Sequence, residues 1–298
     1  MRFIKRKGVA GWLFVIPYLV FTIIFFVIPF VWSFMLIFSE WNLISPVRKF
    51  VGLGNLLEAL QSRRVWAAAV TPFKIMAIFL PTVLIVSIGI AVLINSFKRM
   101  QGLLAVAFFL PYLASGVATS LVVRGLVSYT SPVNMWLLKT IGYVPNWLGD
   151  PFLAVLVIAL MIAWRFSGYY ALIFLSGLQS IPKELYEAAQ IDGAGRIKSF
   201  FKITLPQLYP ALYSVMILAV GMMFGIFTEP YMLTGGGPDL ATHTWHLEIY
   251  YQAFSTMRAG YASSIALYNA LAVFIFVGIV RRIMESWGRA YGWEDENA

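Results

Sequence analysis

The chain has 298 residues, of which 60% are hydrophobic and only 12% are charged, and its mean hydropathy is +0.80. Soluble domains carry about 25% charged residues, so this composition argues against two soluble domains and indicates an integral membrane protein. The net charge of +9 includes no long basic run, which argues against nucleic-acid binding. The absence of cysteine excludes a disulfide scaffold and thiolate metal sites.

Six segments are long and apolar enough to cross a membrane, since a spanning helix needs about 20 mostly apolar residues. In chain order they cover residues 11–38, 71–96, 103–127, 152–178, 207–232 and 262–280. The first follows a basic leader, but its apolar run is too long for a signal peptide and no A-x-A cleavage pattern follows, so we interpret it as a retained anchor. The predicted fold is an all-α integral membrane protein with six transmembrane helices, forming a single domain over residues 1–298.

The distribution of Lys and Arg predicts the orientation of these spans, because cytoplasmic segments carry an excess of both. Six spans place both termini on one side. If that side is the cytoplasm, the inner segments carry 13 basic residues and the outer segments carry six, namely Arg48, Lys49, Arg63, Arg64, Lys139 and Arg258. The bias is about two to one and predicts that the N- and C-termini are cytoplasmic, although the first outer segment with its four basic residues fits least well.

Residues 179–206, between the fourth and fifth spans, form a charged loop with internal order. Ser180 is suited to cap a helix and Pro182 to occupy its first turn. Glycine accepts the left-handed backbone conformation, so Gly193 and Gly195 are expected to end that first helix. The apolar positions then predict a second short helix, followed by the fifth span at Leu205-Pro206. Periodicity alone leaves two readings open, a helical pair lying on the membrane surface or a protruding knob that docks onto a soluble partner.

The loop also carries a specific pattern. Glu187-Ala188-Ala189, Gly193 and Ile203-x-Leu205-Pro206 together fix seven residues over a span of 20. This matches the EAA motif of ABC importer permeases at every defined position. The segments GYYALIFLSGLQSIPKELYEAAQIDGAG and YMLTGGGPDLATHTWHLEIYYQAF are similar to the binding-protein-dependent sugar permeases of the maltose and glycerol-phosphate type. The resemblance covers residues 10–290 and is strongest over 150–255.

The resemblance implies a complete transport assembly in the cell inner membrane. Such permeases pair with a second, homologous permease, bind two cytoplasmic ABC ATPase subunits, and receive a sugar from an extracytoplasmic solute-binding protein. The loop of residues 179–206 would be the coupling helix that docks on one ATPase, through Glu187, Ala188, Ala189, Gly193, Ile203, Leu205 and Pro206. The chain itself has no G-x-x-x-x-G-K-[ST] phosphate loop, so no ATP hydrolysis, catalytic residue or cofactor is expected in it.

The outer segment after the fifth span contains TGGGPD, residues 234–239, which predicts a turn that shapes the outer mouth. No strand precedes it and no Lys-Ser/Thr follows, so a phosphate-cradling loop is the weaker reading. His243 and His246 are three positions apart, but the sequence offers no clear third ligand, so no metal site is expected.

Five polar side chains fall within or near the spans and are candidates for a substrate pathway: Lys74, Arg124, Arg165, Glu229 and Asn269. Ionisable residues at membrane depth usually face the protein interior or a wet cavity. Each could instead lie at an interface and extend its charged end to water. With aromatic faces nearby, such groups suit the hydroxyls and ring faces of a sugar, neutral or acidic.

Three other functions compete with a sugar importer. A secondary transporter would show 10–12 spans or inverted halves. A membrane enzyme would need a converging acid, base or metal constellation. An ABC importer permease for a non-sugar solute is the nearest alternative, but the outer segment resembles sugar permeases.

Overall fold

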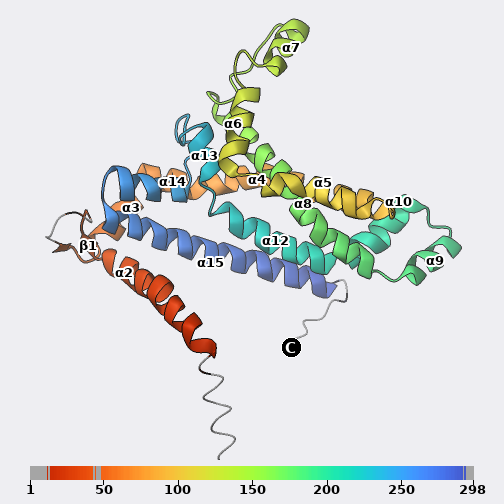
Figure 1. Ribbon diagram of the computed structural model, residues 1–298, viewed down its shortest axis with the longest axis horizontal. Coiled ribbons are helices and arrows are strands. Elements are labelled where there is room, and N and C mark those ends of the chain that lie inside the picture. The colour runs from red at the N-terminus through yellow and green to blue at the C-terminus, as the bar shows by residue number, and fades with distance from the viewer. Residues whose placement is uncertain (1–11, 13, 43, 45–47, 291, 293–298) are drawn as a thin grey trace, which may run out of the picture. The chain divides into compact units, whose positions relative to one another are not determined.

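The computed structural model describes residues 12, 14–42, 44, 48–290 and 292. These residues are mostly helical and include one two-stranded hairpin (Figure 1). They divide into two compact units, the first combining the chain up to Val65 with Glu248–Tyr268, and the second combining Trp66–Leu247 with the chain from Asn269 onward. Helices α4 (Arg63–Ser96) and α15 (Ala259–Ala290) contribute residues to both units. The single domain over residues 1–298 stays a prediction, and the basic leader lies outside the described residues.

The helices agree with the predicted number of spans. Within the described part of the chain, four are long and apolar enough to cross a membrane by themselves: Phe14–Leu36, Arg63–Ser96, Pro151–Ser180 (α8) and Ala259–Arg289. Two further candidates are bent pairs, Gln101–Leu113 (α5) with Gly116–Leu126 (α6) at 88°, and Arg196–Gln207 with Tyr209–Met223 (α12) at 64°. Counting each pair as one span gives six. The first helix ends with α2 (Ile28–Leu36) and contains a π-helical segment, Ile23–Val27.

Several helices begin or end elsewhere than the predicted spans, because hydropathy records apolarity and not helix continuity. The second helix begins at Arg63, before residue 71, since the alanines of residues 67–69 extend the helix beyond the apolar run. The third span breaks at Ala114 and Ser115, which adopt extended backbone. The fifth span ends at Met223, not residue 232, and α13 (Thr228–Leu233) follows as a separate short helix. The sixth helix covers 259–290, longer than the predicted 262–280.

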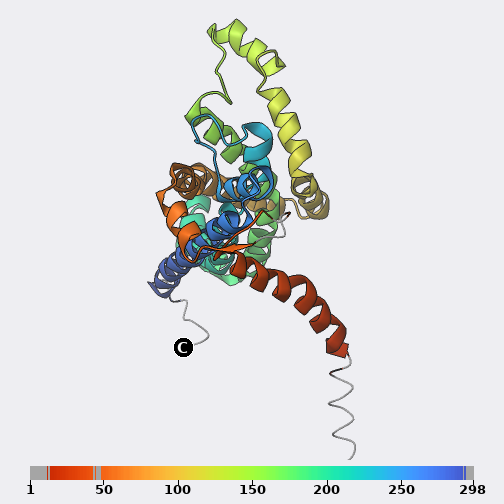
Figure 2. The same ribbon diagram turned by 90° about the vertical axis from the view of Figure 1, so that its left-hand side faces the viewer.

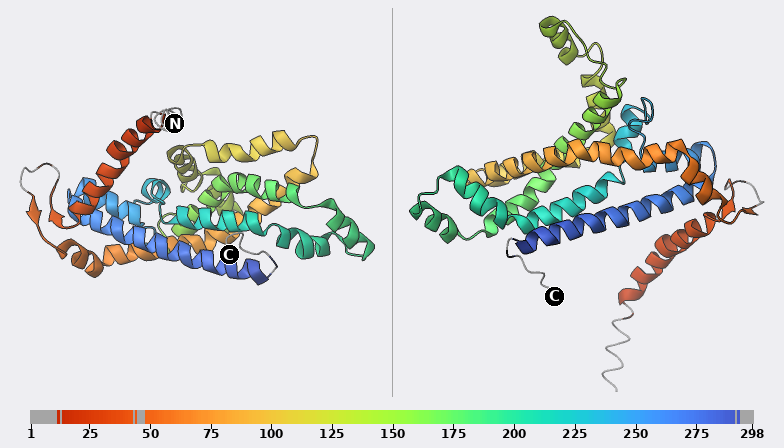
Figure 3. Two further views of the ribbon diagram at one scale, coloured as in Figure 1. Left: turned by 90° about the horizontal axis from the view of Figure 1, so that it is seen from below. Right: turned by 180° about the vertical axis from the view of Figure 1, so that it is seen from behind.

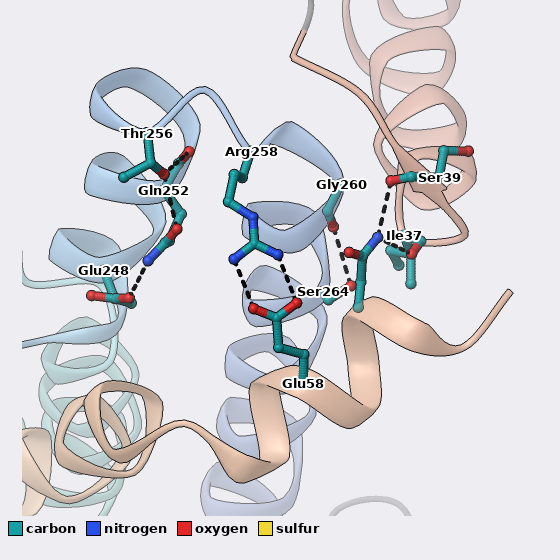
Figure 4. A network of polar contacts seen from close by, with 10 residues as sticks. Ile37, Ser39, Glu58, Glu248, Gln252, Thr256, Arg258, Gly260 and Ser264 are labelled. Carbon is teal, nitrogen blue, oxygen red and sulfur yellow. Dashed lines mark hydrogen bonds and ion pairs between the residues drawn. The ribbon is translucent and has the colours of Figure 1, made fainter. Parts of the chain in front are cut away.

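The first unit is built around a short hairpin. Strands β1 (Ser39–Glu40) and β2 (Lys49–Phe50) pair antiparallel, with Ser39 opposite Phe50. Asn55, on α3 (Gly54–Gln61), is buried and donates 2.9 Å hydrogen bonds to the carbonyls of Ile37 and Ser39. Figure 4 shows this anchor beside a two-bond ion pair between Arg258 and Glu58. Side-chain bonds to the backbone therefore hold the hairpin and α3 together.

The second unit has much of its core along α8, which buries half of its 30 residues. Helices α5 and α12 both pack against α8 (Figures 1 and 3). Gly168 lies so close to the Phe108 carbonyl of α5 that a Cβ at this position would overlap the oxygen. The close α5–α8 approach therefore depends on the missing side chain, as small residues permit between membrane helices. Figure 2 shows the sharp turn from α5 into α6.

The remaining described helices are short. They are α7 (Pro132–Ile141), α9 (Lys183–Ile191), α10 (Arg196–Ser199), α11 (Leu205–Gln207) and α14 (Trp245–Tyr250), with π-helical segments at Phe200–Thr204 and Tyr251–Ser255. Helices α9 and α10 project at one end of α8 and α12 (Figure 3).

Candidate functional site

The loop of residues 179–206, called the coupling loop below, forms two helical pieces as predicted, although its start differs from the prediction. Ser180 is the last residue of α8, and its hydroxyl donates to the Gly177 carbonyl at 2.8 Å, so it does not cap α9. Pro182 occupies the N-cap position of α9, which has no side-chain cap.

The bend between the two helices depends on one glycine, not two. Gly193 has φ +72°, the left-handed conformation predicted for it, and follows the C-cap residue Asp192. The amide of Ala194 then donates to the Ala189 carbonyl at 2.8 Å and closes the turn. Gly195 has φ −68° and ψ 169°, extended backbone open to any residue, and is the N-cap residue of α10. The prediction that Gly195 ends the first helix was therefore wrong.

The EAA residues lie at different depths. Glu187, Ala188 and Gly193 are exposed, whereas Ala189 is partly covered. Ile203, Leu205 and Pro206 are half-buried at the start of the fifth span, around the 64° bend. The pattern therefore joins an exposed helix to the base of a spanning helix.

Large apolar side chains are exposed on this loop. Ile191 is 87% exposed and Ile197 is 77% exposed, and Leu185 and Phe201 are exposed as well. Exposed charged residues such as Glu187 and Lys198 occur on the same loop, so its surface combines apolar and charged side chains. Contiguous apolar side chains at a polar rim are typical of protein or membrane contact sites.

One side-chain contact ties α9 to the base of the fifth span. The Tyr186 hydroxyl lies 2.9 Å from Oγ1 of Thr204, which is only 6% exposed and ends the π-helical segment. A groove of about 520 Å³ lies beside this contact, lined by Asn95 and Ser96 of α4 and by Gln190 and Arg196 of the loop. Sequence reasoning missed this pair, since nothing in an 18-residue separation signals a hydroxyl contact.

The second candidate cluster lies where α6, α8 and α13 meet. Nη1 of Arg165 and Oε1 of Glu229 are 2.6 Å apart, and the two side chains are 16% and 8% exposed. The Arg165 guanidinium also lies 5.0 Å from the Phe166 ring centroid. A Cβ at Gly116 would come within 2.7 Å of Arg165 Nη1, so this glycine leaves room for the pair. Arg165 Nε is buried without a partner in the described chain.

Three of the predicted pathway residues do not join this pair. Arg124 is exposed on α6, and its closest polar contact is the Met232 carbonyl at 3.5 Å. Lys74 is exposed on α4 and makes no hydrogen bond or ion pair within the described residues. Asn269 is 8% exposed, and its Oδ1 has no partner in the part of the chain that is described. The structure therefore groups Arg165 with Glu229 and leaves the other three apart from them.

Aromatic rings continue from the pair along α8. The ring centroids of Tyr112 and Tyr169 are stacked 4.7 Å apart, and Tyr112 also meets Phe166 edge-on. Tyr169 also lines a groove of about 710 Å³, together with Phe109 and the serines Ser176, Ser180 and Ser214. Ring faces with neighbouring hydroxyls form a surface on which a sugar can stack and hydrogen-bond.

The outer segment is a structural turn, as predicted. Gly235 and Gly236 have positive φ, and the Thr242 hydroxyl donates to the Gly237 carbonyl at 2.8 Å. His243 is buried against Gly236, while His246 Nδ1 lies 3.1 Å from the Phe224 carbonyl. Burial lowers the pKa of His246, and the bond to that carbonyl acts in the opposite direction. Among the described residues, no three His, Asp or Glu side chains are grouped to hold a metal.

Residues 50–287 match the protein family described as "Binding-protein-dependent transport system inner membrane component". The chain is 29% identical to the trehalose/maltose transport system permease protein MalF of Thermococcus litoralis, over 93% of this chain and 94% of that protein. It is 32% identical to the lactose transport system permease protein LacF of Rhizobium radiobacter, over 90% and 92%.

A solved structure has the same fold. The chain superposes with a TM-score of 0.80 on a chain of a bacterial ABC transporter involved in the import of the acidic polysaccharide alginate, at 20% identity, covering 95% of this chain and 98% of the other. At this identity the likeness concerns the fold.

Proposed function

The chain belongs to the family of binding-protein-dependent inner-membrane transport components, and we propose that it is the permease subunit of an ATP-driven importer for a carbohydrate. Family membership gives it the role of a multi-pass membrane permease and not of an enzyme. The sugar assignment is carried by the two relatives, which match about nine-tenths of the chain and are both named as sugar permeases. The stacked rings and serine-lined groove along α8 support it, because they offer both kinds of contact that sugars need.

We propose that the substrate passes beside the Arg165–Glu229 pair, with Lys74, Arg124 and Asn269 also on the pathway. An uncharged sugar fits the pair better than an acidic one, because the Glu229 carboxylate already neutralises the Arg165 cation at 2.6 Å. A uronate would have to compete with that carboxylate for the same guanidinium. Lys74 and Arg124 are exposed, and neither forms an ion pair with Glu229 in the described chain.

We also propose the partners that such a subunit requires. These are a second homologous permease, two cytoplasmic ABC ATPase subunits, and an extracytoplasmic binding protein that delivers the sugar. The coupling loop would dock on one ATPase through Glu187, Ala188 and Ala189, with Gly193 setting the bend. Ile203, Leu205 and Pro206 would then carry the movement into the fifth span. The exposure of Ile191 and Ile197 supports this assignment, because a protein partner would cover them.

The proposed orientation places both termini in the cytoplasm. The basic residues of the first outer segment fit least well, but three of them have local partners. Arg48 Nε donates to Ser39 Oγ at 2.7 Å, Arg64 pairs with Glu248 at 2.9 Å, and Lys49 lies opposite Glu40 in the hairpin. Reporter fusions test the topology: fusions at Gly142 and Ala241 should report the outside, and fusions at Lys98 and Gly195 the inside. An inside signal at Ala241 would contradict it.

The decisive experiment is uptake by vesicles that hold the complete transporter and its binding protein. Neutral oligosaccharides, uronate oligomers and amino acids are compared as substrates, and neutral sugars should be taken up fastest. Transport of amino acids or peptides with no sugar uptake would overturn the proposal.

The coupling assignment is tested in the same vesicles with two glycine variants. Gly193→Val forces a side chain into the left-handed region, at a cost of about 1–3 kcal/mol, and should abolish uptake while membrane insertion is retained. Gly195→Ala is the matched control, because its extended backbone accepts any residue. Normal uptake and normal ATPase association in Gly193→Val would show that the loop does not couple.

A further inference from the structure

Among the described residues, one side-chain hydrogen bond joins α9 of the coupling loop to another part of the fold. The Tyr186 and Thr204 hydroxyls are 2.9 Å apart, across 18 positions of chain. No other described element packs extensively on α9. The remaining hydrogen bonds near the end of α9 are local backbone bonds that close its own last turn. The helix is therefore attached by its two ends and by this one contact.

Both covalent attachments of α9 are poorly suited to transmit movement. At its start the backbone is extended through Ile181 and Pro182, and at its end it turns through the left-handed Gly193. Neither link continues the helix, and the second is held only by the backbone hydrogen bonds of its own turn. The groove of about 520 Å³ separates the loop from the end of α4, so that helix does not brace it. A push on α9 that travelled only through Gly193 would be absorbed by rotation of the glycine backbone.

Thr204 is well placed to receive such a push. It is 6% exposed and ends the π-helical segment Phe200–Thr204, and only the short helix α11 separates it from the 64° bend into α12. Its carbonyl accepts the Leu208 amide at 3.0 Å, so Thr204 is itself held at the first turn of the fifth span. The hydroxyl contact thus joins the two ends of the segment that runs from Tyr186 through Gly193 to Thr204.

We propose that the Tyr186–Thr204 hydroxyl pair is a positioning contact that carries the displacement of α9 directly to the base of the fifth span. The two residues are positioning residues and do not touch the substrate. This inference rests on the proposed function, because it concerns how the same loop passes ATPase movement to the membrane. The contact would make α9, the glycine turn and the π-helical segment move as one body.

The test uses the full transporter in vesicles and measures substrate molecules imported per ATP hydrolysed. Tyr186→Phe and Thr204→Val each remove the bond while keeping nearly the same volume. The ratio should fall by about fivefold in either variant, because one ordinary hydrogen bond contributes about 1 kcal/mol and this changes an equilibrium constant by about fivefold. Thr204→Ser keeps the hydroxyl and should retain the wild-type ratio. The double variant should be no worse than the poorer single variant, since both lose the same contact.

Two controls separate this effect from general destabilisation. Thr82→Val removes a hydroxyl that bonds only to its own helix at Ile78, and Tyr268→Phe removes a bond to the Leu56 carbonyl. Both should keep the wild-type ratio. The inference is overturned if the single variants keep the wild-type ratio, if Thr204→Ser falls as far as Thr204→Val, or if the losses multiply in the double variant. It is also overturned if Tyr186→Phe loses ATPase binding, because the contact would then serve docking.

Failure of the proposed function gives a different result. In that case the wild-type transporter imports no sugar, or Gly193→Val leaves uptake unchanged. If Gly193→Val abolishes uptake while Tyr186→Phe does not alter the ratio, only the present inference fails.

Discussion

Removing one member of the Arg165–Glu229 pair should destabilise the folded chain strongly. The atoms are 2.6 Å apart and the side chains are 16% and 8% exposed, so the charge left behind stays largely out of water. Breaking a buried pair costs about 3–5 kcal/mol. Because Arg165 Nε is already buried without a partner, we expect the lower end, about 3 kcal/mol. For a chain of 298 residues, that cost corresponds to a fall of about 5 °C in the thermal midpoint.

The assay is thermal unfolding of the purified chain in detergent, followed by tryptophan fluorescence. Glu229→Leu and Arg165→Met are measured singly and together. The double variant should recover most of the loss, since it replaces the pair by apolar groups of similar size. The control is Arg281→Gln, which breaks an exposed ion pair with Glu285 one helical turn away and should shift the midpoint by less than about 2 °C.

The reasoning about the pair would be refuted by either of two results. Single variants that shift the midpoint no more than the Arg281 control would show that the pair is not desolvated. Additive losses in the double variant would show that Arg165 and Glu229 act independently.

Three further predictions concern other parts of the chain. Gly168→Ala should destabilise the fold by about 1–3 kcal/mol, because the added methyl group forces α5 and α8 apart. The control, Gly89→Ala, lies in open space on α4 and should be neutral within error in the same unfolding assay. Equal effects of the two substitutions would contradict the close approach of α5 and α8. The Arg258 guanidinium holds the pKa of Glu58 below its usual value of 4.5, so the pair stabilises the fold above the unfolded pKa, and its contribution is lost as pH falls through the lower folded pKa. Both side chains are about half exposed, so Glu58→Gln should lower the free energy of unfolding by at most about 1 kcal/mol at pH 7. The thermal midpoint of this variant should also depend less on pH between pH 5 and 3 than that of the wild type. An unchanged pH dependence would contradict the pairing. Asn269→Leu should leave the thermal midpoint unchanged or raise it, because Oδ1 of Asn269 is buried without a partner among the described residues. The same variant should slow uptake if the residue lies on the pathway. A large loss of stability would instead indicate a structural role.

The sequence by itself determined the features that depend on local chemistry. Insertion of a span requires about 20 apolar residues in succession, so six candidates could be counted without any knowledge of their contacts. The left-handed bend at Gly193 could likewise be predicted, because backbone freedom belongs to the residue itself. The EAA pattern identified the loop for the same reason, since its seven positions lie within 20 residues.

Only the tertiary structure decided which distant groups meet. Arg165 could be named as a costly cation, but its partner lies 64 positions away on a short helix that the apolar pattern had merged with the fifth span. The 88° bend at Ala114 and Ser115 was also invisible to hydropathy, which does not register backbone direction. The Tyr186–Thr204 contact has no periodic signature, because it depends on how the chain folds back after Gly193 and not on the sequence around either hydroxyl.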